Sequence, residues 1–200
     1  MIHRLDEIQL RVLGCLIEKQ RTTPEQYPLT LNALRLACNQ ATNRDPVLQL
    51  DESQVRVGAQ SLGTLGWARL ATGPGSRTPK YRQLFSEALD LMPSEVSILA
   101  VLMLRGAQTV AELKTRTERL HHFASADDVT AELARLEAKE LVRLLPRQAG
   151  QREERWLHLL ADERTAEAPE AAAETATIEQ RLGRVEARLA ELERRLDEQR

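Results

Sequence analysis

Cysteine and histidine are the side chains in this sequence best suited to binding a metal, but their spacing does not favour a metal site. Cys15 and Cys38 fall on or near the apolar faces of two predicted helices. Such positions favour buried, reduced thiols, with a disulfide or redox switch as the alternative. His121 and His122 are adjacent, so their rings point in different directions on a helix. A metal needs convergent ligands, and we therefore expect none.

Catalytic arrangements are equally hard to find. The chain carries 30 Asp and Glu residues, but they fall at solvent-facing positions of predicted helices. The sequence has no Ser/His/Asp arrangement, no glycine-rich phosphate loop and no zinc motif. We therefore expect a protein that is not an enzyme and needs no cofactor.

A polar stretch between two predicted helices, residues 38–46, is the first candidate binding site. Its polar side chains are Asn39, Gln40, Asn43, Arg44 and Asp45. They could bind a nucleotide, a peptide or a phosphate group. Alternatively they close the helix and brace the turn, with Arg44 and Asp45 paired to neighbours.

Basic side chains gather in two predicted β-hairpins, which are the second candidate. The first hairpin carries Arg77, Lys80, Tyr81 and Arg82, and the second carries Arg143, Arg147, Arg152 and Arg155. Both clusters could contact a nucleic-acid backbone. The alternative is ordinary charge at a strand edge, which discourages pairing between sheets of different molecules.

These residues belong to a sequence that repeats once, over residues 5–86 and 92–160. At a constant offset of 74, Val55, Leu62, Trp67 and Leu70 match Val129, Leu136, Leu141 and Leu144. The offset grows to 79 for Thr30 against Thr109, and to 86 for Leu13 against Leu99. The first copy therefore carries about a dozen extra residues, in the loops between its helices, where insertions are tolerated.

Each copy reads as three helices followed by two short strands. Capping boxes are predicted for Asp6 with Gln9, Asp51 with Gln54 and Thr109 with Glu112, and Thr30 is predicted as a simple cap. Residues 67–71 and 81–85 flank a Gly-Pro-Gly-Ser turn at 73–76, and residues 141–145 and 155–160 repeat the hairpin. We expect a mainly α fold with small β-wings: two tandem winged helix-turn-helix domains, residues 1–86 and 87–160.

The third helix of such a unit can enter a DNA major groove. In the first copy, residues 51–66, it exposes Arg56, Gln60 and Thr64, although Gly58 and Gly63 weaken it. In the second copy this helix carries four acidic residues that would repel phosphates: Asp127, Asp128, Glu132 and Glu137. Only Arg135 is left there to contact bases. The first copy is therefore the better candidate for DNA.

The charge balance does not favour nucleic acid. Lys plus Arg against Asp plus Glu is 11 to 9 over residues 1–90, 10 to 10 over 91–160 and 7 to 11 over 161–200. No segment has the basic excess that phosphate binding usually leaves.

The last forty residues differ from the repeats. Residues 161–177 are almost all Ala, Glu, Thr and Pro, which predicts a linker. Residues 178–200 follow a heptad pattern, with Ile178, Leu182, Val185, Leu189, Leu192 and Leu196 at the a and d positions. The e positions Glu179, Glu186 and Glu193 and the g positions Arg181, Arg188 and Arg195 pair opposite charges only in a parallel arrangement. We expect self-association through a parallel coiled coil, as a dimer or a trimer; the alternative is an amphipathic helix folded onto the chain's own body.

No apolar run approaches the roughly 20 residues of a membrane-spanning helix, and residues 1–7 do not read as a signal peptide. We expect a cytoplasmic protein without a membrane partner.

One family shares several of these motifs. They are Tyr27-Pro28-Leu29-Thr30-Leu31-Asn32-Ala33-Leu34, Ala37-Cys38-Asn39-Gln40, Asn43-Arg44-Asp45-Pro46, Leu104-Arg105-Gly106, and residues 112–120 and 145–153. The sequence resembles the YceH-like family of bacterial proteins, which have no assigned function. The resemblance implies tandem winged-helix domains and no established activity. Ala41, where the family usually has a basic residue, and Gly58 depart from its pattern.

Two functions remain. The first is a DNA-binding protein like a transcription regulator, which uses the third helix of the first copy and both hairpins. The second is a protein-interaction or scaffold module, in which the acidic third helix of the second copy forms part of the surface. Near-neutral charge favours the second, and analogy of fold favours the first.

Overall fold

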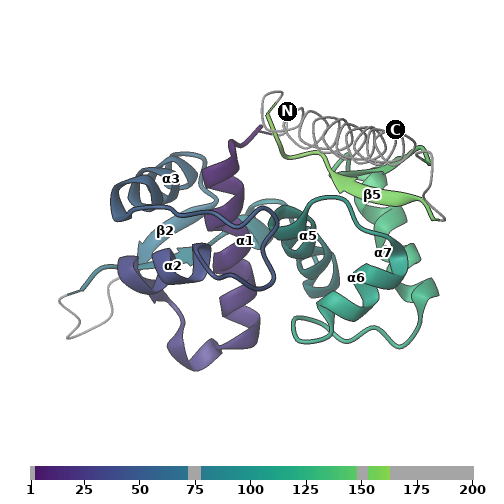
Figure 1. The fold of residues 1–200 in the computed structure, drawn as a ribbon, viewed down its shortest axis with the longest axis horizontal. Coiled ribbons are helices and arrows are strands. Elements are labelled where there is room, and N and C mark those ends of the chain that lie inside the picture. Colours follow the sequence, from purple (N-terminus) through teal and green to yellow (C-terminus); the bar gives the residue numbers. More distant parts are fainter. Residues whose placement is uncertain (1–2, 72–77, 148–152, 163–200) are drawn as a thin grey trace, which may run out of the picture. The chain divides into compact units, whose positions relative to one another are not determined.

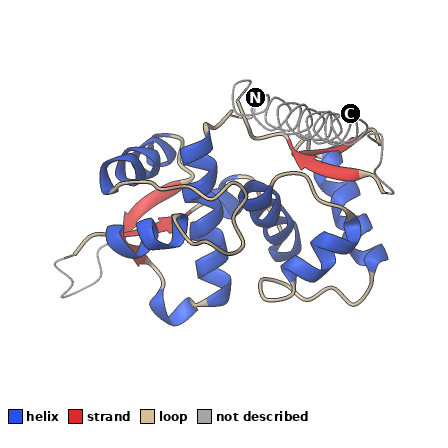
Figure 2. Ribbon diagram, viewed as in Figure 1, coloured by secondary structure: helices blue, strands red, loops and turns tan. Residues whose placement is uncertain are grey.

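The computed structural model describes residues 3–71, 78–147 and 153–162. Within them the protein is mixed α/β, with seven α-helices and two small antiparallel sheets (Figures 1 and 2). Several predictions lie outside these residues: the turn at 73–76, Arg77 and Arg152, all of the linker beyond residue 162, and the heptads of residues 178–200.

Each repeat contains three main helices followed by two strands. The first comprises α1 (Glu7–Thr22), the 3₁₀ turn η1 (Pro24–Gln26), β1 (Leu29–Thr30), α2 (Leu31–Cys38), α3 (Glu52–Thr64), β2 (Ala68–Ala71), β3 (Lys80–Gln83) and the short α4 (Phe85–Ala88). The second comprises α5 (Pro93–Arg105), α6 (Val110–Thr117), α7 (Ala126–Ala138), β4 (Val142–Leu145) and β5 (Arg155–His158).

The offsets read from the sequence reappear in the elements. Both ends of α7 lie 74 residues after those of α3, and both ends of α6 lie 79 after those of α2. Helix α5 begins 86 residues after α1. Strand β5 follows β3 at 75, so the second hairpin has one residue more between its strands.

Local capping explains where the helices begin. The predicted boxes at Asp6, Asp51 and Thr109 all have both reciprocal hydrogen bonds, and Thr30 accepts from the Ala33 amide. A fourth box, Ser125 with Asp128, begins α7. This box is hard to predict from the sequence, because Asp at the third position is shorter than the usual Glu or Gln.

The two sheets are built to one plan. In the first, the order is β1-β3-β2, with Leu29 opposite Tyr81. The second sheet holds β4 and β5, and the isolated antiparallel bridge of Gln108 with Trp156 lies beside it. Gln108 corresponds to Leu29 at the offset of 79, and Trp156 corresponds to Tyr81 at the offset of 75. The bridge is therefore the equivalent of β1 in the second repeat, shortened to one residue pair.

The first helices of the two repeats pack against each other at the centre of the molecule (Figure 1). Residues 94–104 of α5 are buried on every side, and residues 98–104 are all apolar, as expected for a helix buried all round. Gly14 of α1 permits this contact, because a Cβ atom there would lie 2.8 Å from Leu104 Cγ. Gly58 of α3 likewise allows close packing against α1, because a Cβ atom there would lie 3.0 Å from Ile8 Cγ2.

A second contact joins the repeats near the N-terminus. The Leu5 amide donates to the Leu160 carbonyl at 2.7 Å, and Leu5 pairs with Ala161 in a parallel bridge. Residues Met1–Ala161 form one compact unit with a continuous buried apolar cluster. The division of this unit into two domains, residues 1–86 and 87–160, stays a prediction. Among the described residues, no helix is long and apolar enough to span a membrane.

Candidate functional site

The outer face of α3 is the first surface to consider. Val55, Gly58, Ala59 and Leu62 form its buried stripe, and Gly58 meets Ile8 of α1. The helical period then turns the opposite side to solvent. That exposed side carries Ser53, Arg56, Val57, Gln60 and Thr64.

Arg56 and Gln60 lie one helical turn apart on this face, and both are exposed. Arg can donate two hydrogen bonds to guanine, and Gln can pair with adenine, in a DNA major groove. The Thr64 hydroxyl instead donates to the Gln60 carbonyl at 3.3 Å. Arg56 and Gln60 are therefore the two side chains of this face with the chemistry to contact base edges.

The β2–β3 hairpin presents a basic outer face. Arg69 lies directly opposite Arg82, and Ala71 lies opposite Lys80. Because side chains alternate along a strand, Arg69, Lys80 and Arg82 share one face. Arg82 pairs with Glu87 at 2.7 Å. Like charges placed opposite each other destabilise a sheet, so this face is suited to an anionic partner.

The strand register removes one residue from the candidate surface and adds another. Tyr81 lies on the inner face of the hairpin and is buried, so its ring belongs to the core. Arg69 was missed by the sequence analysis, because only the register places it beside Lys80 and Arg82.

The second repeat offers a weaker surface for DNA. On α7, Asp127, Asp128 and Glu137 are exposed, and Arg135 is paired with Glu132 at 2.7 Å. Arg155 donates to Glu112 and to the Ala107 carbonyl. Arg143 and Arg147 are exposed.

The polar stretch at 38–46 divides into internal and surface residues. The Arg44 side chain is fully buried and pairs with Glu18 at 2.6 Å. The Asn39 side chain bonds to both the amide and the carbonyl of Leu50. Both residues thus brace the loop, while Asp45 is exposed.

Gln40 and Asn43 of the same stretch line a cavity of about 430 Å³ between the repeats. Neither lies on the face of α3 or the β2–β3 hairpin. Arg56, Gln60, Lys80 and Arg82 therefore belong to a surface formed by α3 and the first hairpin, and Gln40 and Asn43 line a cavity on another part of the molecule.

The cysteines are free and buried. A hydrogen bond with the Cys15 thiol, together with burial, raises the pKa of Cys38. In the described ranges, no three His, Cys, Asp or Glu side chains gather as a metal site would require.

Comparison with known proteins gives a family but no activity. Residues 5–151 match the family described as a protein of unknown function, DUF480. A UPF0502 protein of Pseudomonas fluorescens is 48% identical over 169 residues, which cover 84% of this chain and 77% of the relative. A UPF0502 protein of Geobacter sulfurreducens is 49% identical over 172 residues, covering 84% and 78%. The resemblance to a bacterial family of unassigned function is thereby confirmed.

Proposed function

Because the chain belongs to the DUF480 family, whose function is unknown, we propose an activity from its own surfaces: binding of double-stranded DNA by the first repeat. The protein would act as a winged helix-turn-helix binder, with α3 in the major groove and the β2–β3 hairpin against the backbone. This proposal is for a cytoplasmic protein that is not an enzyme.

The observation that carries the proposal is the match between two neighbouring surfaces. Helix α3 exposes Arg56 and Gln60, the side chains suited to base edges. It leads within a few residues into β2, and the hairpin turns Arg69, Lys80 and Arg82 to one face. Base-reading and backbone-contacting groups thus come from adjacent elements.

The net charge of the chain sets the affinity for DNA that we expect. A formal net charge of −2 gives little long-range attraction to DNA. Binding should therefore rest on the local basic face of the hairpin, and it should weaken steeply as salt screens the phosphates. We expect micromolar binding to non-specific duplex at low salt.

Changing Arg69, Lys80 and Arg82 together to Ala tests the hairpin. We expect the variant to bind mixed-sequence duplex more weakly and with a flatter salt dependence, since each lost phosphate contact lowers the slope by about one. Fluorescence anisotropy of the full chain at several salt concentrations measures both quantities. A variant with Lys114→Ala, Arg116→Ala and Arg119→Ala, in and just after α6, removes the same number of positive charges from the second repeat and is the control. Equal affinity and slope in all three proteins would remove the proposal.

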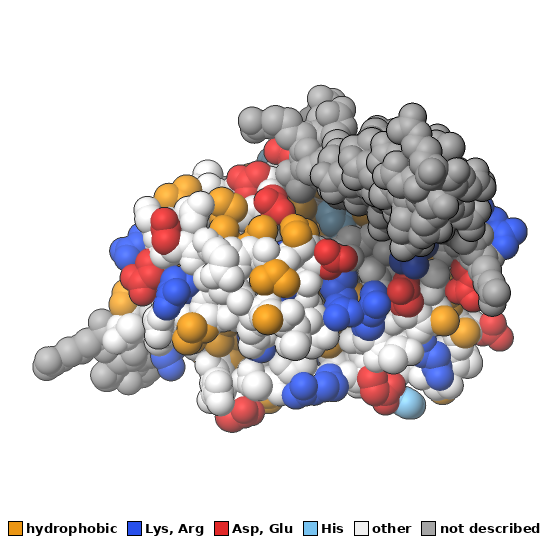
Figure 3. Space-filling view, in the orientation of Figure 1, with side chains coloured by type: hydrophobic (Ala, Val, Ile, Leu, Met, Phe, Trp, Pro, Cys, Tyr) orange, Lys and Arg blue, Asp and Glu red, His pale blue; other side chains and the backbone are white. Residues whose placement is uncertain are grey.

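A specific observation favours the alternative, a protein-interaction module. Leu36 and Val57 are 55% and 57% exposed, and Val47 is 49% exposed. Figure 3 shows hydrophobic side chains on the face around α2 and α3. Exposed apolar groups often mark protein contacts when they gather. Absence of duplex binding at low salt would favour this function.

Self-association through the heptads of residues 178–200 is also part of the proposal. The a and d positions supply an apolar seam, and the Glu and Arg positions favour parallel pairing. We expect that deleting residues 163–200 changes the mass in light scattering from a multiple of the chain to a single chain. A monomeric full-length protein would contradict the coiled coil.

A further inference from the structure

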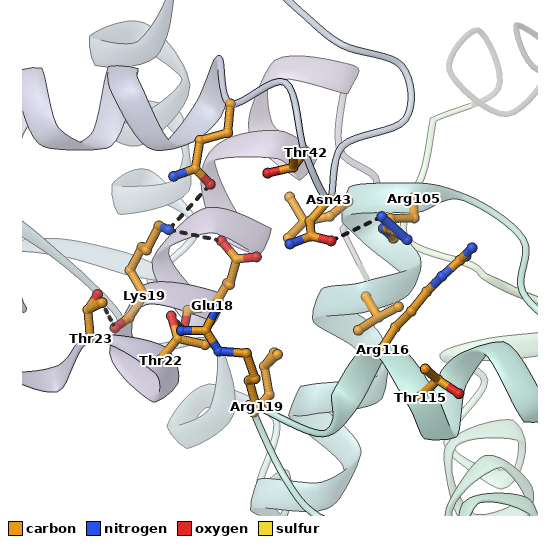
Figure 4. A pocket seen from close by; sticks show the side chains of 14 residues that line it. Glu18, Lys19, Thr22, Thr23, Thr42, Asn43, Arg105, Thr115, Arg116 and Arg119 are labelled. Atoms are coloured by element: carbon orange, nitrogen blue, oxygen red, sulfur yellow. Dashed lines mark hydrogen bonds and ion pairs between the residues drawn. The ribbon is translucent and has the colours of Figure 1, made fainter.

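The cavity between the repeats lies apart from the proposed DNA surface. Figure 4 shows its wall, which combines the last turns of α1, the loop around Asn43, the end of α5 and the end of α6. Its polar lining residues are Glu18, Lys19, Thr22, Thr23, Gln40, Thr42, Asn43, Arg105, Thr115, Arg116 and Arg119. Four of these are cationic and one is a carboxylate.

The nearby carboxylates do not neutralise these cations. Glu18 is shared by Arg44, at 2.6 Å, and Lys19, at 3.6 Å. Glu112 is likewise shared by two arginines, Arg116 at 3.3 Å and Arg155 at 2.9 Å. Each carboxylate thus faces two positive charges, which leaves a positive excess around the cavity.

Arg105 shows the effect of this excess. Its side chain donates a hydrogen bond to a neutral group, the Asn43 side-chain oxygen, at 3.1 Å. Its buried Nε has no hydrogen-bond partner within the described residues. Burial, followed by the charge of Arg116, lowers its pKa, and the opposing charge of Asp45 offsets this only in part. An anion in the cavity would relieve this repulsion and supply an acceptor.

Arg119 supplies a second cation to the cavity. It is exposed, and no carboxylate of the described residues pairs with it. In Figure 4 its side chain extends toward Glu18 and Thr22 of α1. The cavity therefore has a cation on each side, Arg105 from the end of α5 and Arg119 from the turn that follows α6.

Hydroxyl groups contribute less than their number suggests. Thr22, Thr23 and Thr115 donate to carbonyls of their own helices. Recognition is thus left to charged donors, and arginine forks suit the oxygens of a phosphate group.

We propose that this cavity binds the phosphate group of a small phosphate ester, with Arg105 and Arg119 as its main contacts. The volume falls within the usual range for small-molecule sites, which is roughly 300–1,000 Å³. Val101, Leu104 and Leu120 supply an apolar wall for the organic part. The site is independent of DNA binding, since it shares no residue with α3 or the first hairpin.

Titration calorimetry on the full-length protein tests the site with three probes: adenosine monophosphate, adenosine and inorganic phosphate. We expect the monophosphate to bind most tightly, inorganic phosphate to bind more weakly, and adenosine not to bind. Arg119→Gln and Arg105→Gln should each weaken binding of the monophosphate by roughly tenfold or more, the usual effect of losing a charged hydrogen bond. Arg143→Gln, in the second hairpin, is the matched control and should bind normally.

Arg119 is exposed, so its variant should fold even where the Arg105 variant does not. Binding of adenosine as tight as that of the monophosphate would overturn the proposal. So would unchanged affinity in Arg119→Gln. Equal affinity for inorganic phosphate and the monophosphate would overturn the assignment of an ester and leave a bare phosphate site.

Discussion

Replacing Arg44 with Met is expected to lower the free energy of unfolding by about 3–5 kcal/mol, the usual cost of breaking a buried ion pair. The Arg44 side chain is fully buried, and that of Glu18 is 11% exposed. Removing the Arg44 guanidinium leaves the Glu18 carboxylate without its closest partner. Lys19, at 3.6 Å, remains as partial compensation, so the lower end of the range is expected.

Arg44 also satisfies backbone groups, which adds to the effect. Its guanidinium donates to the carbonyls of Ala37 and Asn43 and to the side chain of Gln40. These contacts join the end of α2 to the loop that follows it, while Glu18 joins both to α1. Loss of Arg44 therefore weakens the attachment of the loop between α2 and α3 to both α1 and α2.

Urea denaturation followed by circular dichroism measures this loss. The double variant Glu18→Leu with Arg44→Met removes both charges, and we expect it to be more stable than Arg44→Met alone. A single variant within about 0.5 kcal/mol of the native protein would show that the ion pair does not hold the loop.

The second large effect is a loss of stability in mild acid that depends on His158. Burial, with the charge of Arg4 as a smaller cause, lowers the pKa of His158 from 6.5 to about 4. The unfolded chain thus takes up this proton near pH 6.5, and the folded chain only near pH 4. The contribution of His158 to stability is complete above pH 6.5 and falls as the pH drops to about 4, by about 3 kcal/mol in all.

The hydrogen bond at His158 agrees with a neutral ring. Its Nδ1 accepts from the Leu160 amide at 3.3 Å, which a proton on that nitrogen would prevent. His158→Asn keeps an acceptor near the same place and does not titrate. We expect thermal unfolding to shift less between pH 7.5 and pH 5 in this variant than in the native protein. Parallel pH profiles for the two proteins would contradict the assignment.

The sequence predicted those parts of the fold that depend on local signals. The box of Asp51 with Gln54 places the start of α3 without any knowledge of tertiary structure. The offset of 74 residues aligns α3 with α7 and β2 with β4, because each repeat buries the same positions. Most strand boundaries shifted by one or two residues, as is common where strands end in turns.

Long-range pairing could not be predicted. Arg44 and Glu18 lie 26 residues apart, and no local rule connects a loop arginine to a helical glutamate. The basic face of the first hairpin needed the register that sets Arg69 opposite Arg82. The cavity depends on packing between α1 and α5, which neither repeat specifies alone.

The contact of Gly14 with Leu104 has a consequence for synthesis of the chain on the ribosome. Gly14 is translated 90 residues before Leu104, the residue that packs against it. The separation between Leu5 and its partner Leu160 is longer still. When the first repeat emerges, one apolar side of α1 has no cover until α5 has also emerged. The newborn first repeat therefore exposes to solvent a surface that the finished protein buries between its repeats.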